Sequence, residues 1–141
     1  MSEFVRNELA RRLKGSCTCG KVSYSVLDEF SYASYCHCSN CRKSTGSAFK
    51  AFAGIEIEKF DLVTGSESLM QVGDDRGHDV RCSSCGSYLY SVVREGKYVH
   101  VTFGTLIDIP TIRPTEHIFV GSKAEWFTIT DDLPQYSKFP I

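Results

Sequence analysis

The sequence predicts one all-β domain made of short antiparallel strands with few short helical turns. Its 141 residues are enough for a single hydrophobic core, and a composition of 42% hydrophobic and 23% charged residues is typical of a folded chain. Runs of alternating polar and apolar residues recur along the sequence, which is the pattern of strands with one buried face. Clusters of Gly, Asp and Ser separate these runs and indicate hairpin turns.

The predicted strands begin at residue 21. Residues 21–26 (KVSYSV) alternate clearly, and the later runs are rich in Val, Ile, Phe and Tyr, which favour extended structure. These later runs occupy residues 47–53, 68–72, 87–93, 98–106, 117–120 and 125–129. Turn residues stand between them at 65–66, 73–75 and 95–97.

Two segments carry a helical signal. Residues 3–13 place apolar side chains near helical spacing, although residues 10–15 equally suit the approach to a first strand. Ser39 is a candidate N-cap for a single turn through residues 40–44, which Gly46 would end. That turn would carry Cys41.

Charge and hydropathy restrict the class of partner and the location. The 16 Lys and Arg residues against 17 Asp and Glu residues supply no net field for a phosphate backbone, so nucleic acid is not expected as a partner. No apolar run approaches the ~18 to 20 residues needed to cross a bilayer. Charged residues interrupt the N-terminal segment, which therefore lacks the apolar region of a secretory signal. We expect a cytoplasmic protein with no membrane partner and leave its oligomeric state open.

Four of the seven cysteines form two short pairs, each followed directly by glycine. The pairs are Cys17-Thr18-Cys19-Gly20 and Cys82-Ser83-Ser84-Cys85-Gly86. A turn that aims two thiolates at one ion often needs a positive φ at the next residue, which glycine adopts readily. Four thiolates make the closed tetrahedral site of structural zinc. Two disulfides or four unrelated thiols are the alternatives, and a Cys17–Cys19 bridge would be strained.

The other three cysteines, Cys36, Cys38 and Cys41, lie within six residues. Three converging thiolates leave a fourth position on zinc for water or substrate, which is the mark of a catalytic site. A redox sensor or a metal buffer is the alternative for such thiols. Strand alternation predicts that the His37 side chain points away from the two cysteines beside it.

Several cations stand close to these cysteines in the sequence. Lys21 and Arg81 are near the two pairs, and either is suited to balance thiolate charge or simply to face solvent. Arg42, Lys43 and Lys50 follow the three-cysteine segment, and as a group they are candidates to bind a substrate carboxylate.

Five stretches in order resemble the glutathione-dependent formaldehyde-activating enzyme family, which also includes centromere-protein-V-like proteins. They are GSCTCGKVSYSV (15–26), CHCSNCRKSTGSAF (36–49), RCSSCGSYLY (81–90), FGTL (103–106) and HIFVGSKAEWFTITDDLPQY (117–136). The resemblance implies a β-tent fold with two zinc sites in one domain at residues 15–141, with residues 1–14 as an N-terminal extension. It also implies that Cys17, Cys19, Cys82 and Cys85 bind structural zinc and that Cys36, Cys38 and Cys41 bind active-site zinc.

The activity that this resemblance implies is a carbon–sulfur lyase reaction, which joins or splits glutathione and formaldehyde. One departure is visible, because Ile107 stands where the family has an acidic residue and Asp108 comes one place later. Two other functions compete. A non-catalytic zinc module would use surface residues such as Trp126 to bind a protein, and a thiol redox sensor would use the three clustered cysteines. A substrate-sized cleft at Cys41 would favour the lyase, with walls expected from Tyr35, Phe49, Phe52, Trp126, Phe127 and Tyr136.

Overall fold

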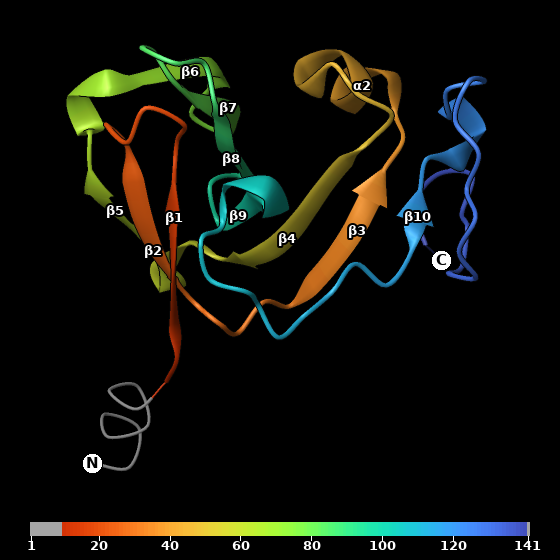
Figure 1. Cartoon of the computed structure of the whole chain (residues 1–141), viewed down its shortest axis with the longest axis horizontal. Helices are drawn as coiled ribbons and strands as arrows, with labels where there is room; N and C mark the ends of the chain where they lie inside the picture. Colours follow the sequence, from red (N-terminus) through yellow and green to blue (C-terminus); the bar gives the residue numbers. More distant parts are fainter. Residues whose placement is uncertain (1–9, 141) are drawn as a thin grey trace.

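The computed structural model describes residues 10–140, which form two β-sheets and one α-helix (Figure 1). A three-stranded sheet has the order β1-β2-β5 and a seven-stranded sheet the order β10-β3-β4-β9-β8-β7-β6. Neighbouring strands are antiparallel except β10 and β3, which are parallel. The strands are β1 (Arg12–Ser16), β2 (Ser23–Leu27), β3 (Tyr32–Cys36), β4 (Lys50–Glu56), β5 (Phe60–Thr64), β6 (Leu69–Asp74), β7 (Gly77–Cys82), β8 (Tyr88–Val93), β9 (Tyr98–Thr102) and β10 (His117–Ile118). The prediction of an all-β fold is confirmed.

Helical structure is sparse in the described part of the chain. The α-helix α2 (Ser39–Thr45) and four single 3-10 turns, at Ile57–Lys59, Ser66–Ser68, Phe103–Thr105 and Val120–Ser122, make up all of it. Between residues 10 and 140, no helix has the length and apolar character needed to cross a membrane.

The alternation of side chains across the seven-stranded sheet separates an apolar face from a polar face. Val80, Tyr90 and Val101 are neighbours in register and belong to the buried core. The adjacent row of neighbours, Asp79, Ser91 and His100, points to the opposite face because successive residues of a strand alternate. The apolar row packs with buried side chains from the smaller sheet, and the polar row is left to line a cleft.

Several strands lie at or near the predicted runs, and one predicted run is wrong. Residues 125–129 form no strand. A turn replaces it, in which the Phe127 amide donates to the Ala124 carbonyl and the Lys123 ammonium donates to the carbonyls of both residues. The sequence analysis also missed β3, β5 and β7. Strand β7 escaped notice because its cleft-facing positions are polar, and β3 because two consecutive residues are buried.

The helical predictions had mixed outcomes. Helix α2 covers the predicted turn and ends at Gly46, whose φ of 65° is the left-handed conformation that glycine favours. The predicted cap is wrong, because the sulfur of Cys38, and not Ser39, accepts the Cys41 amide. The possible helix at residues 3–13 falls mostly outside the described residues, and its end lies in β1. Strand β1 likewise takes in residues 12–14 of the predicted N-terminal extension.

Candidate functional site

Four cysteines from distant parts of the chain meet at one point. Cys17 and Cys19 follow β1, while Cys82 ends β7 and Cys85 lies in the turn after it. The sulfur of Cys19 lies 3.7 Å from the sulfurs of both Cys17 and Cys82, and all four sulfurs lie within 4.8 Å of one another. A tetrahedral zinc with Zn–S bonds of about 2.3 Å requires sulfurs about 3.8 Å apart, whereas a disulfide requires about 2.05 Å. This four-cysteine cluster (Cys17, Cys19, Cys82, Cys85) therefore has the geometry of a metal site.

The turns of the four-cysteine cluster have the predicted backbone. Gly20 and Gly86 have φ values of 83° and 81°. The Val22 amide donates to the Cys17 sulfur at 3.3 Å and the Cys85 amide donates to the Cys82 sulfur at 3.5 Å. Such N–H groups stabilise thiolate charge, so the donors present fit a bound cation.

A second cluster lies at the end of β3. Cys36 is the last residue of the strand, Cys38 caps α2 and Cys41 is in its first turn. Their sulfurs also lie within 4.8 Å of one another, and no fourth His, Cys, Asp or Glu of residues 10–140 joins them. Hydrogen bonding from the Cys41 thiol lowers the pKa of Cys36 to about 6. This three-cysteine cluster (Cys36, Cys38, Cys41) fits a metal with one coordination position left for another ligand.

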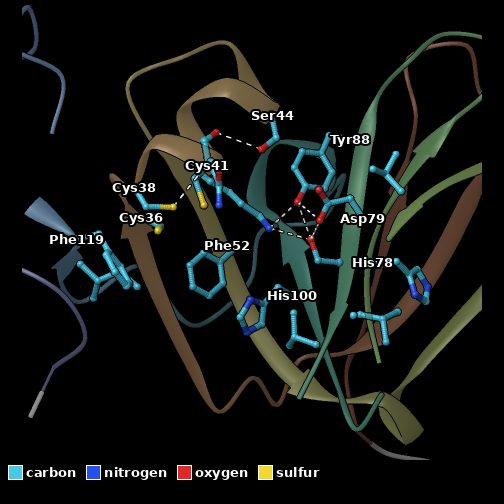
Figure 2. Close-up of a pocket in the computed structure, with 18 of the residues that line it drawn as sticks. Cys36, Cys38, Cys41, Ser44, Phe52, His78, Asp79, Tyr88, His100 and Phe119 are labelled. Carbon is cyan, nitrogen blue, oxygen red and sulfur yellow. Dashed lines mark hydrogen bonds between the residues drawn. The ribbon is translucent and has the colours of Figure 1, made fainter. Parts of the chain in front are cut away.

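A cleft of about 470 Å³ opens beside the three-cysteine cluster. Figure 2 shows Cys36, Cys38 and Cys41 on one side of it and Tyr88, Asp79 and His78 on the other, with Phe52 and His100 between them. A second hollow of about 420 Å³ shares Phe52, Val93, His100, Ile118 and Phe139 with the cleft and extends to Arg94. Together the two spaces have the size of small-molecule sites.

Lys50 is a buried cation in the wall of the cleft. Its side chain is only 6% exposed, and its ammonium donates to the Tyr88 hydroxyl at 2.8 Å and to the Ser91 hydroxyl at 3.0 Å. Both hydroxyls donate in turn to the same carboxylate oxygen of Asp79, each at 2.8 Å. Burial lowers the pKa of Lys50, while the Cys41 and Asp79 charges act in the opposite direction. The four residues (Lys50, Tyr88, Ser91 and Asp79) form the lysine network.

Two of the three predicted binding cations lie outside the cleft. Arg42 is half-buried and Lys43 is exposed, and neither is among the described residues that line the cleft or the second hollow. Of the three cations proposed from the sequence, Lys50 is the one in the wall. At the far end of the second hollow, the Arg94 guanidinium lies over the rings of Tyr32 and Tyr98, at 4.9 and 4.7 Å from their centroids.

Of the aromatic residues expected to wall the site, only Phe52 is among the described residues that line the cleft, and Tyr136 packs against the buried cluster behind it. Phe52 lines the cleft, where Phe119 and Phe139 join it. Trp126 is 72% exposed and lies outside it. The rings of Tyr35, Phe49 and Phe127 instead pack around two buried histidines.

Those histidines form a hydrogen-bonded chain with an aspartate. His37 is fully buried and is not part of the three-cysteine cluster, and its Nε2 lies 2.8 Å from Nδ1 of His117. The other ring nitrogen of His117 lies 3.0 Å from the Asp131 carboxylate. Desolvation, with the neighbouring His117, lowers the pKa of His37 to about 4. The hydrogen bonds from His37 through His117 to Asp131 therefore attach the C-terminal segment to the residue between Cys36 and Cys38.

Arg81 connects the two cysteine clusters. Its guanidinium donates to the Gly86 carbonyl, beside Cys85, at 3.0 Å, and also to the Ser44 carbonyl of α2. It lies over the Tyr88 ring at 4.7 Å from the centroid.

Ile107, the residue that departs from the family pattern, is not among the described residues that line the cleft. Its amide donates to the Lys14 carbonyl of β1.

The sequence analysis missed Asp79, Tyr88, Ser91 and Arg94 as site residues. Asp79 pairs with Ser91, and Ser91 pairs with His100, so three polar residues form one row across the sheet. This row indicates a site only once the strand order is known. Arg94 lies in a turn where it and Glu95 both have positive φ, at 54° and 59°. Its neighbours Tyr32 and Phe139 come from distant segments, so no local pattern marks it.

Known proteins resemble this chain in sequence and in structure. Residues 12–122 match the family described as "Glutathione-dependent formaldehyde-activating enzyme". A relative from Halomonas elongata, which provisionally carries that enzyme's name, is 33% identical over 127 residues, covering 83% of this chain and 80% of its own. A crystal structure of a Rhodobacter sphaeroides protein superposes with a TM-score of 0.57 at 25% identity, covering 70% of this chain and 91% of the other. The chain belongs to the glutathione-dependent formaldehyde-activating enzyme family.

Proposed function

We propose that this protein is a zinc-dependent carbon–sulfur lyase that joins a small thiol, glutathione or a close relative, to an aldehyde and splits the same adduct. The observation that carries the proposal is a cluster of three cysteines, with no fourth ligand among the described residues, that opens into a cleft with a buried lysine in its wall. Zinc bound there would favour the thiolate form of a substrate thiol at neutral pH. The four-cysteine cluster would hold zinc for structure alone.

The shape of the site supports a peptide-like thiol. The cleft and the second hollow share five residues, so a ligand with its thiol at the three-cysteine cluster has room to extend toward Arg94. Glutathione carries carboxylates several bonds from its sulfur, and a guanidinium is well suited to bind one. Arg94 is the cation in that position, while Arg42 and Lys43 remain candidates for a carboxylate that projects out of the cleft.

The cleft weighs against the two competing functions. A docking module would present a flat apolar patch, and the exposed Trp126 stands apart from the cleft. A redox sensor needs accessible thiols but gains nothing from a buried lysine network opposite them. The cytoplasm, where glutathione is abundant and thiols stay reduced, is the compartment in which we expect the protein to act.

Titration of the zinc-loaded protein with glutathione and with S-methylglutathione tests this proposal. The thiol is expected to bind at least tenfold more tightly, because only it supplies a thiolate to the metal. Metal analysis of the same sample should give two zinc ions per chain. Equal affinity for the two compounds would mean that the sulfur does not reach the three-cysteine cluster, and the docking module would then be the better explanation.

A further inference from the structure

The lysine network places a buried charge where apolar side chains of similar size often pack with equal or greater stability. Burying an ammonium group in a wall of the core is unfavourable unless its hydrogen bonds and charge are satisfied. Here Asp79 balances the charge of Lys50 through the two hydroxyl groups of Tyr88 and Ser91. A buried, hydrogen-bonded and charge-balanced cation beside a cleft is a feature of sites that stabilise developing negative charge.

One hydrogen of the Lys50 ammonium is left for a ligand. An ammonium group has three N–H donors, and Tyr88 and Ser91 accept two of them. No third acceptor for Lys50 occurs in the hydrogen bonds of residues 10–140. Lys50 lines the cleft, so a substrate oxygen there is the partner available to it.

The position of Lys50 relative to Cys36 indicates which oxygen that is. The two residues are direct partners across β3 and β4, so their side chains leave the same face of the sheet with Cβ atoms about 4.5 to 5.5 Å apart. The three-cysteine cluster and the Lys50 ammonium therefore line the same cleft, with the ammonium directed toward Tyr88 and Ser91. An oxygen on the carbon that bonds to a cluster-bound sulfur lies at this end of the cleft, whereas the carboxylates of a glutathione-like thiol are several bonds farther away.

We propose that Lys50 is a catalytic residue that donates a hydrogen bond to the aldehyde oxygen, with Tyr88, Ser91 and Asp79 as positioning residues. This role rests on the lyase function proposed above. The sulfur electron pair forms the new C–S bond, the C=O π pair moves onto oxygen, and Lys50 stabilises the charge that develops there. The proton that the thiol loses on binding is balanced by the proton that the product oxygen gains. The sum is thiol plus aldehyde giving a hydroxyalkyl thioether, with no oxidation or reduction, and splitting of the adduct follows the reverse course.

Two substitutions and a matched control separate this role from carboxylate binding. Lys50→Met removes the charge and keeps the length of the side chain, Lys50→Arg keeps the charge, and Lys97→Met removes a lysine from an exposed hairpin position. Glutathione affinity is measured by calorimetry, and adduct formation from glutathione and ¹³C-formaldehyde is measured by exchange NMR. Melting curves and zinc content establish that each variant is folded and loaded.

Lys50→Met is expected to keep glutathione affinity within about twofold and to lose about 10²-fold in kcat, the usual effect of deleting one oxyanion donor. Lys50→Arg should recover part of the rate, and Lys97→Met should match the wild type. Tyr88→Phe removes one acceptor of the ammonium without changing a charge, so it should lower kcat less, and it provides the test if Lys50→Met fails to fold.

Three results would overturn the proposal. A kcat of Lys50→Met within threefold of the wild type would remove Lys50 from the reaction. A loss of glutathione affinity that matches the loss of rate would make Lys50 a carboxylate anchor. Wild-type protein that neither binds the thiol nor accelerates adduct formation would reject the lyase function itself, and the role of Lys50 with it.

Discussion

Substitution of Cys82 by serine is expected to destabilise the whole fold. Cys82 is fully buried at the end of β7, and its sulfur meets that of Cys19, which is 63 positions away and follows β1. A metal shared by these residues would link the three-stranded sheet to an outer part of the seven-stranded one. Losing a cross-link that closes a loop of this length costs about 4 kcal/mol in chain entropy alone. That is a large fraction of the 5 to 15 kcal/mol that stabilises a typical domain.

Thermal unfolding followed by circular dichroism measures this loss. We expect the melting temperature of Cys82→Ser to fall by roughly 15 °C or more, or the protein to be insoluble, since 1 kcal/mol shifts a chain of this size by about 3 to 5 °C. Wild-type protein stripped of metal by a strong chelator should melt near the variant, because both lose the same link. A Cys82→Ser protein that melts within 2 °C of the wild type would show that the four-cysteine cluster does not hold the sheets together.

The remaining predictions concern the cleft and the hydrogen bonds of Asp28, which follows β2. Cys41→Ser should fold, keep about one zinc by metal analysis and lose adduct formation, because its cluster closes a loop of only a few residues and loses about 2 kcal/mol or less; global unfolding would contradict this. Arg94→Ala should raise the KM for glutathione with little change in kcat, since a distant carboxylate contact is made equally in the ground and transition states, and a larger effect of Arg42→Ala would instead favour the cation proposed from the sequence. Asp28→Asn should lower stability by about 1 to 3 kcal/mol in denaturant titrations, because the buried carboxylate accepts from Arg11 and from the amide and hydroxyl of Thr111. Burial acts to raise the pKa of Asp28, but these hydrogen bonds outweigh it and hold the pKa below its ordinary value, so the carboxylate's contribution is present above pH ~4 and is lost as the pH falls through the folded-state pKa. A wild-type and variant pair with the same acid dependence would refute the role of Asp28.

The metal clusters were predictable because local sequence carries their geometry. A pair of cysteines followed by Gly20 or Gly86 indicates both the candidate ligands and the backbone conformation of the turn, whereas the meeting of the two pairs depends on the fold. Alternation along a strand likewise indicates the direction of His37.

The far wall of the cleft was not predictable in the same way. Asp79 and Ser91 are recognisable as site residues only when β7 is known to pair with β8, because this pairing places a polar row opposite the three-cysteine cluster. Arg42 follows Cys41 in the sequence, and the turn of α2 leaves it outside the described lining of the cleft, so its binding of a carboxylate stays a prediction. Proximity in the sequence is therefore a poor guide to a site that is completed by strands from the other half of the chain.

Arg81 belongs to the part of the molecule that keeps the three-cysteine cluster in shape, which is distinct from the exposed rim of the cleft. It holds the end of α2 to the turn of the four-cysteine cluster and lies over the Tyr88 ring, and it is not among the described residues that line the cleft, whereas Val72 and Phe139 are. Val72 and Phe139 line the cleft at 57% and 66% exposure, where substitutions are well tolerated. In evolutionary terms, such rim positions are free to vary while the geometry of the two cysteine clusters is inherited unchanged.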